Sequence, residues 1–126
     1  MIEKVALVAI GGGIGAVMRF LGAAWFGRLV GAGFLGTMFV NVLGSFLMGL
    51  FAVMIMERMP GNWGRLGPFM ITGILGGFTT FSAFSLDALY LLERGKIAVA
   101  MAYVGGSVLL SIAALFAGLV IARTWL

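Results

Sequence analysis

Residues 34–56 read FLGTMFVNVLGSFLMGLFAVMIM and contain no charged side chain. A bilayer core about 30 Å thick is crossed by about 20 apolar helical residues, so this stretch is long enough to span a membrane. The whole chain of 126 residues has the same character, because 63% of its residues are hydrophobic, 10% are charged and its mean hydropathy is +1.20. A water-soluble domain carries about 25% charged residues. The composition therefore predicts a protein whose partner is the lipid bilayer.

The charged residues divide the chain into four apolar stretches. The connections between these stretches are too short to hold a soluble domain, so residues 1–126 form a single four-helix transmembrane domain. We expect an all-α, multi-pass membrane protein whose function lies within the membrane. The predicted spans are residues 5–27, 34–56, 66–92 and 97–122.

The polar composition excludes several classes of function. The chain has eight Lys and Arg and four Asp and Glu, which gives a net charge of +4. The basic residues are scattered along the sequence and form no stripe that could follow a phosphate backbone. We therefore expect no nucleic-acid partner. The chain has no Cys and no His, so it lacks thiolate chemistry and the usual general base near neutral pH. We expect that the protein is not an enzyme.

The basic residues are almost evenly divided between the two predicted membrane faces. An excess of Lys and Arg on one side normally sets the orientation of a membrane protein. The near balance predicts dual topology, in which copies inserted both ways meet as an antiparallel homodimer. The alternative is that the balance only reflects a short chain. One face carries Lys4, Arg58, Arg65 and Arg123, and the other carries Arg28, Arg94 and Lys96.

Two of the predicted spans carry a stripe of polar residues spaced four apart, which places the members of each stripe along one helix face. Such stripes are typical of a polar track through the membrane. The alternative is that each hydroxyl or amide only hydrogen-bonds to a neighbouring helix or to its own backbone. The stripes are Thr37, Asn41 and Ser45 in the second span, and Tyr103, Ser107 and Ser111 in the fourth.

The third span contains a sequence that favours a break in the helix. Residues 73–85 read GILGGFTTFSAFS, where paired glycines and threonines are poor helix formers. A straight helix over residues 66–92 would also be about 40 Å long, which exceeds the bilayer core. Non-helical backbone at this depth is tolerated where it lines a cavity, and its free carbonyls and amides can hold ions. The alternative is a continuous tilted helix that packs through Gly73 and Gly77.

Phe81 and Phe84 follow this break and share a helix face. The edge of an aromatic ring is positive, so an edge turned inward attracts an anion without a full charge that would trap it. The alternative is that both are ordinary core or lipid-facing residues of a chain with 11 Phe.

Two ionisable residues lie inside predicted spans. Arg19 either raises the local potential for an anion or makes a structural contact, and we favour the structural role. Asp87 lies near the end of the third span, where it either lines an aqueous vestibule or marks the membrane edge.

Pairs of small residues at a spacing of four let membrane helices approach closely. We expect this packing role for Gly11 and Gly15, for Ser45 and Gly49, and for Ala114 and Gly118.

Three motifs in this order carry a family resemblance: Gly15-Ala16-x-x-Arg19, then Gly36-Thr37-x-x-Val40-Asn41, then the run from Gly76 to Ser85. Together with the length and the four spans, they make the chain resemble the Fluc (CrcB) family of fluoride channels. The resemblance implies a channel that exports fluoride passively across the prokaryotic plasma (inner) membrane and lowers cytoplasmic fluoride. It also implies a dual-topology homodimer with two antiparallel fluoride pathways and a structural Na⁺ at the dimer interface.

The resemblance also assigns roles to individual residues. The backbone carbonyls of Gly76 and Thr79 would hold the Na⁺, and the ring edges of Phe81 and Phe84 would contact fluoride. The remaining pathway residues would be Asn41, Thr80, Ser82, Tyr103, Ser107 and Ser111. The chain departs from the usual family pattern at Asp87, where Glu is common, and at Ala83, where Thr is common, so the role of Asp87 is carried over less directly.

Two other functions remain open from the sequence. One is a proton-coupled small four-helix exporter that uses Asp87 as its carboxylate. The other is a structural assembly subunit that transports nothing.

Overall fold

The computed structural model describes residues 1–126 and contains helices but no strands. Four helical stretches are long and apolar enough to cross a membrane: Ile2–Val30, Gly33–Glu57, Pro60–Glu93 and Ile97–Trp125. The prediction of an all-α membrane protein with four apolar spans is confirmed. Only 21 of 126 residues are buried within the single chain, so most of its large apolar side chains lie on the outer surface.

The first, second and fourth spans are simple in outline, whereas the third is composite. The first is α1 (Ile2–Val30), the second is α2 (Gly33–Ala52) extended by the π-helix η1 (Val53–Glu57), and the fourth is α6 (Ile97–Trp125). The third consists of the 3₁₀ turn η2 (Pro60–Asn62), α3 (Trp63–Leu66), the π-helix η3 (Gly67–Leu75), α4 (Gly76–Phe78) and α5 (Phe81–Glu93).

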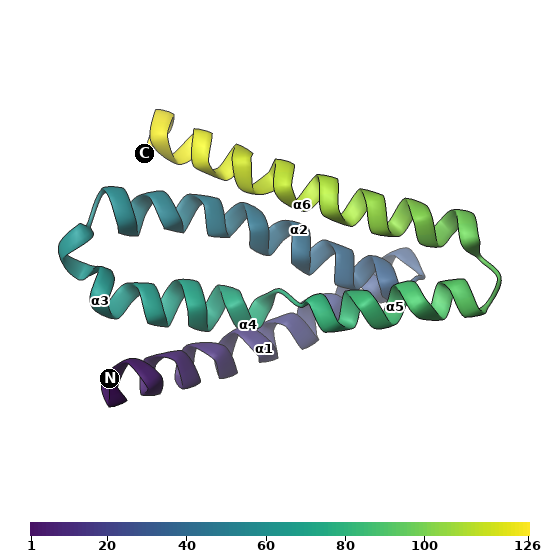
Figure 1. The fold of residues 1–126 in the computed structure, drawn as a ribbon, viewed down its shortest axis with the longest axis horizontal. Coiled ribbons are helices and arrows are strands. Elements are labelled where there is room, and N and C mark those ends of the chain that lie inside the picture. The colour runs from purple at the N-terminus through teal and green to yellow at the C-terminus, as the bar shows by residue number, and fades with distance from the viewer.

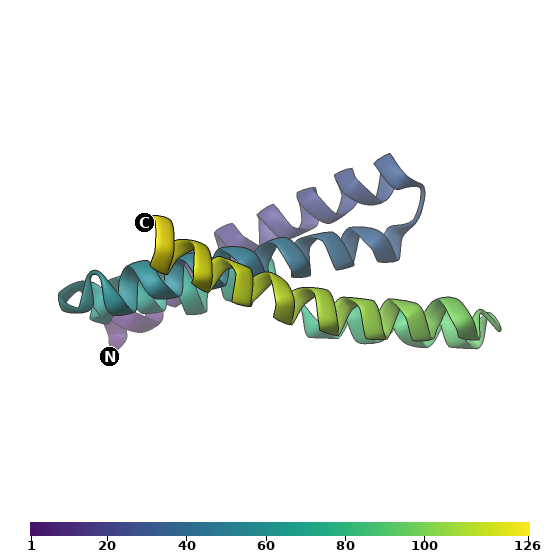
Figure 2. The ribbon, with the colours of Figure 1, turned by 90° about the horizontal axis from the view of Figure 1, so that it is seen from above.

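The helices form an elongated bundle (Figure 1). The two termini and α3 lie at one end, while the α1–α2 and α5–α6 connections lie at the other (Figure 1). Helix α1 passes behind α4, and α6 runs alongside α2 (Figure 1). Figure 2 shows that α1 and the start of α2 diverge from α5 and the start of α6. The four basic residues that we expect on one membrane face therefore share one end of the molecule.

Helix α1 packs closely on the third span through glycines. A Cβ atom on Gly11 would meet the carbonyl oxygen of Phe69, and one on Gly15 would meet the carbonyl oxygen of Ile74. Backbone therefore touches backbone at this crossing, and the packing role predicted for Gly11 and Gly15 is confirmed. The glycines that face α1 from the third span are Gly73 and Gly77.

The third span has two consecutive residues with extended backbone between α4 and α5. The dihedrals are φ −93° and ψ 156° at Thr79, and φ −150° and ψ 123° at Thr80. The Thr80 hydroxyl accepts a hydrogen bond from the amide of Ala83 at 3.1 Å, and so caps the N-terminus of α5. Thr is a favoured residue at this position because its oxygen satisfies an amide without a partner in the helix. We refer to these two residues as the Thr79–Thr80 segment.

Candidate functional site

A groove lies beside the Thr79–Thr80 segment, between α2, α5 and α6, and we call it the polar groove after the hydroxyl and amide groups within its mainly apolar lining. Its volume is about 340 Å³. Both polar stripes contribute to it, so two helices far apart in sequence present hydroxyl and amide groups to one space. The predicted site residues that line the groove are Asn41, Thr79, Thr80, Phe81, Phe84, Ser107 and Ser111, and Ser45 lines it as well.

Asn41 joins α2 to the Thr79–Thr80 segment by two hydrogen bonds. Its Nδ2 donates to the carbonyl oxygen of Thr80 at 2.9 Å, and its Oδ1 accepts from the Thr80 amide at 2.7 Å. The side chain thereby replaces the partners that a continuous helix would have provided. Since an unpaired backbone group away from water is costly, Asn41 stabilises the extended conformation at membrane depth.

Two carbonyl groups beside this segment lose their usual helical donors. The amide of Thr80, which would bond to the Gly76 carbonyl in a continuous helix, donates to Asn41 instead. The amide of Ala83, which would bond to the Thr79 carbonyl, donates to the Thr80 hydroxyl. The carbonyls of Gly76 and Thr79 are therefore available to another partner. The Thr79 hydroxyl does not compete for them, because it donates to Leu75 at 3.0 Å.

Phe81 and Phe84 meet at the groove from the first turn of α5. Their ring centroids are 5.4 Å apart and the rings are inclined at 54°. The two rings differ in burial: Phe84 is 8% exposed, whereas Phe81 is 77% exposed within the single chain. The first turn of a helix also carries amides without intrahelical partners and a partial positive charge, which favours an anion nearby.

Ser107 presents an unsatisfied group to the groove. The residue is 4% exposed, and its hydroxyl oxygen is buried without a hydrogen-bond partner. Buried hydroxyls are normally paired, so an unpaired hydroxyl in the wall of a polar groove indicates a place where a ligand or water can be held.

Tyr103 and Asp87 lie outside the lining of the groove and contact each other. The Tyr103 hydroxyl donates to Asp87 Oδ2 at 3.2 Å. Tyr103 is buried and its ring packs against Phe84, with centroids 5.4 Å apart. The polar stripe of α6 is therefore divided, with Ser107 and Ser111 in the groove and Tyr103 behind it.

Arg19 reaches the third span from α1. Its Nε donates to the carbonyl oxygen of Gly77 at 2.9 Å. The residue also lines a second hollow of about 280 Å³ together with Thr37 and Thr80. Ser82 lies at the surface, where its hydroxyl is 3.2 Å from the Thr80 hydroxyl, and it does not line the polar groove.

Gly44 is a lining residue that the sequence reasoning missed. A Cβ atom at this position would meet the Thr79 methyl carbon and would come within 3.0 Å of the Phe78 ring. The missing side chain lets α2 approach the Thr79–Thr80 segment closely enough for Asn41 to bond to it. The position of Gly44 in the sequence could have indicated this role, since Gly44 follows Asn41 by three residues and shares its helix face.

The structure contains no group of three or more His, Cys, Asp or Glu side chains that could hold a metal ion.

Comparison with known proteins gives full-length matches. Residues 6–119 match the family model described as CrcB-like protein, Camphor Resistance (CrcB). A protein of Cereibacter sphaeroides named fluoride-specific ion channel FluC is 53% identical over 127 residues, which cover 100% of this chain and 99% of that protein. A protein of the same name from Agrobacterium fabrum is 48% identical, over 95% of this chain and 96% of that protein. Another, from Rhizobium meliloti, is 50% identical, over 96% of this chain and 97% of that protein.

Proposed function

The chain belongs to the CrcB-like protein family, and from this premise we propose how it works as a fluoride channel. It is a multi-pass membrane protein that exports fluoride passively and thereby lowers cytoplasmic fluoride. It is an ion channel and not an enzyme. The observation that carries the mechanism is the polar groove, in which two polar helix faces, two phenyl rings and the buried hydroxyl of Ser107 surround one space.

We propose that the groove replaces the water around fluoride with close, weak donors. Fluoride is small and strongly hydrated, so a selective pore must offer hydrogen-bond donors at short range, yet each contact must be weak enough to permit exit. Hydroxyl groups meet both demands because they donate a hydrogen bond but carry no charge. Ser107 supports this role because its hydroxyl has no other partner. Asn41, Thr80 and Ser111 would be further donors in the groove. Ser82 and Tyr103 lie outside its lining and would contact fluoride elsewhere on the pathway, if the Tyr103 hydroxyl turns away from Asp87.

The phenyl rings would complete the coordination. A ring edge carries partial positive charge, which attracts an anion without holding it as tightly as Arg or Lys would. Phe81 and Phe84 line the groove, and their inclined arrangement turns the ring edges in different directions. We propose that both rings contact fluoride as it passes.

We propose that the functional unit is an antiparallel homodimer. Phe81 is 77% exposed in the single chain although it lines the groove, which supports a second copy covering it. The even distribution of Lys and Arg supports insertion in both orientations. Labelling of a single cysteine introduced at Asn62 with an impermeant thiol reagent in whole cells should reach about half of the molecules. Labelling of all or none would contradict dual topology.

We further propose that Na⁺ is held at the centre of this dimer by the carbonyl oxygens of Gly76 and Thr79. Hard cations prefer oxygen ligands, and these are the two carbonyls whose helical donors are diverted to side chains. When bound, the ion would supply fixed positive charge next to an anion pathway. The chain itself contributes the extended Thr79–Thr80 segment and the Asn41 hydrogen bonds that stabilise it.

Removal of Na⁺ is expected to destabilise the purified protein. A ligand that binds only the native state stabilises it by about 2.7 kcal/mol at a concentration of one hundred times its Kd. Exchange of NaCl for N-methylglucamine chloride should therefore lower the unfolding temperature by about 5 °C or more. The measurement is thermal unfolding in detergent at equal ionic strength, with KCl as the second comparison. The same unfolding temperature in all three salts would contradict a bound Na⁺.

The function is tested in cells that lack their own fluoride exporter. Expression of this chain should restore growth at a fluoride concentration that stops the parent cells, because passive export lowers the cytoplasmic level. Growth should not depend on the pH gradient in the way that a proton-coupled exporter through Asp87 would require. No rescue by a chain that reaches the membrane in normal amounts would contradict fluoride export.

A further inference from the structure

Helices α2 and α6 touch backbone to backbone next to the polar groove. A Cβ atom on Gly49 would meet the carbonyl oxygen of Leu115, and one on Gly118 would meet the carbonyl oxygen of Phe46. The same two added atoms would come within 2.9 Å of the Leu119 amide nitrogen and 3.0 Å of the Leu50 amide nitrogen. Neither helix can therefore carry a larger residue here without moving away from the other.

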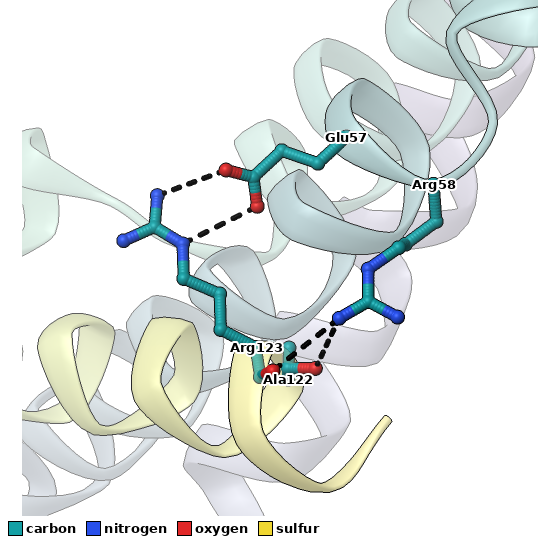
Figure 3. A network of polar contacts seen from close by, with 4 residues as sticks. All are labelled: Glu57, Arg58, Ala122 and Arg123. Atoms are coloured by element: carbon teal, nitrogen blue, oxygen red, sulfur yellow. Dashed lines mark hydrogen bonds and ion pairs between the residues drawn. The ribbon is translucent and has the colours of Figure 1, made fainter.

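An ionic clamp joins the ends of the same two spans. Arg123 donates from Nη2 and Nε to the two carboxylate oxygens of Glu57 at 3.1 and 3.3 Å (Figure 3). Arg58 approaches the end of α6 from the other side, and its Nη2 donates to the carbonyls of Ala122 and Arg123, each at 3.4 Å (Figure 3). The Ala122 carbonyl also accepts from the Leu126 amide at 3.2 Å, and a cation at a helix C-terminus is favourable. We call Glu57, Arg58 and Arg123 the clamp.

The glycine contact is directly continuous with the groove wall. Leu115, whose carbonyl faces Gly49, is itself a lining residue, and Met48 next to Gly49 is another. Ser45 lies one helical turn before Gly49, and Ser111 lies two turns before Gly118. Since a helix transmits displacement along its length, a change in separation at the glycines would change the separation of Ser45 and Ser111.

We propose that Gly49 and Gly118, together with the clamp, are positioning residues that fix the width of the polar groove and thereby exclude anions larger than fluoride. None of these five residues needs to touch the ion. Their effect is to hold α2 and α6 at the shortest distance that the backbones allow, as small residues do between membrane helices. The inference rests on the proposed function, because it concerns the selectivity of the same groove.

A methyl group added at the glycine contact should widen the groove and admit chloride. In Gly118→Ala and Gly49→Ala, we expect chloride efflux from proteoliposomes to rise by about tenfold, which corresponds to a barrier lowered by about 1.4 kcal/mol. Fluoride efflux should change less than chloride efflux, since its donors remain in place. The matched control is Gly105→Ala in the same helix, where an added Cβ would meet nothing within 4 Å. This control should keep the selectivity of the unsubstituted protein.

The clamp provides an independent test that adds no volume to the contact. Arg123→Glu should raise chloride efflux by about threefold, a smaller effect because exposed ion pairs are individually weak. The exchanged pair Glu57→Arg with Arg123→Glu restores opposite charges and should return selectivity toward the original value. A purely structural role would change the amount of folded protein and not the ratio of chloride to fluoride flux.

The outcomes separate this inference from the proposed function. Absence of fluoride flux in the unsubstituted protein would contradict the channel itself. A selective unsubstituted protein whose two alanine variants remain equally selective would overturn the positioning role alone. If the alanine variants do not fold, the clamp variants decide. The positioning role would be overturned if folded Arg123→Glu kept the original selectivity. It would also be overturned if the exchanged pair did not recover the selectivity that Arg123→Glu had lost.

Discussion

Fluoride efflux through the Asn41→Asp variant is expected to fall by at least about one hundredfold. The aspartate can still accept from the Thr80 amide, but it cannot donate to the Thr80 carbonyl, which Asn41 does at 2.9 Å. Leaving that carbonyl unpaired costs about 1–3 kcal/mol. The new negative charge also lies in the wall of the groove, where repulsion of an anion 4 Å away amounts to about 4 kcal/mol at an effective dielectric constant of 20. The measurement is initial fluoride efflux from proteoliposomes.

The control for this variant is Asn62→Asp, which makes the same change at the only other asparagine of the chain. Asn62 lies exposed in the 3₁₀ turn η2 and does not line the groove. Its efflux should match that of the unsubstituted protein. A folded Asn41→Asp variant with normal efflux would contradict the role of Asn41. Asn41→Ala should lose less activity than Asn41→Asp, because it removes the hydrogen bonds without adding charge.

Phe81→Ile is expected to reduce fluoride efflux by more than about tenfold while the protein still folds and inserts. The substitution keeps an apolar side chain of substantial size but removes a ring that lines the groove and whose edge carries partial positive charge. Because Phe81 is 77% exposed in the single chain, its replacement leaves no cavity in the core of the protomer. A loss of about 1.4 kcal/mol in stabilisation at the rate-limiting position is enough for a tenfold change.

A comparison with two other phenylalanines isolates the effect of the ring. Phe116 on α6 is 66% exposed and does not line the groove, so Phe116→Ile should conduct normally. Phe84→Ile should lower both efflux and thermal stability, because Phe84 is buried and packs against Tyr103. Equal efflux from Phe81→Ile and the unsubstituted protein would exclude the ring as a contact of fluoride.

The four transmembrane spans could be predicted from the sequence because the lipid bilayer restricts where charged residues can lie. Charged residues are costly in the bilayer, so their positions mark the span ends. The close approach of α1 to another helix was also predictable, since Gly11 and Gly15 have the spacing that close helix contacts require. Spacing alone gives no partner, however, and only the structure shows that these glycines face Phe69 and Ile74.

The site was only partly predictable because a spacing of four residues does not follow a helix face exactly. Each step of four residues turns by about 40° beyond a full turn, so a stripe of three residues rotates by about 80°. Asn41 and Ser45 therefore line the groove, while Thr37 lines the second hollow with Arg19. In the same way, Ser107 and Ser111 line the groove while Tyr103 lies behind it. The sequence could not show that the stripes on α2 and α6 share one groove.

Two further features had no signal in the sequence. The hydrogen bonds between Asn41 and Thr80 join residues 39 positions apart, and the clamp joins Glu57 to a residue 66 positions away. Such pairings depend on how the helices pack, which local propensity does not encode. Gly44 was overlooked because a glycine in a membrane helix usually indicates helix contact, whereas here it makes room for the Thr79 side chain.

The most direct measurement is fluoride efflux from proteoliposomes that contain the purified protein, followed with a fluoride electrode beside a parallel chloride measurement. Passive, selective conduction through the polar groove predicts rapid fluoride efflux without an imposed pH gradient, and chloride efflux that is far slower than fluoride efflux. Folded protein that releases no fluoride, or that releases fluoride and chloride equally, would contradict it.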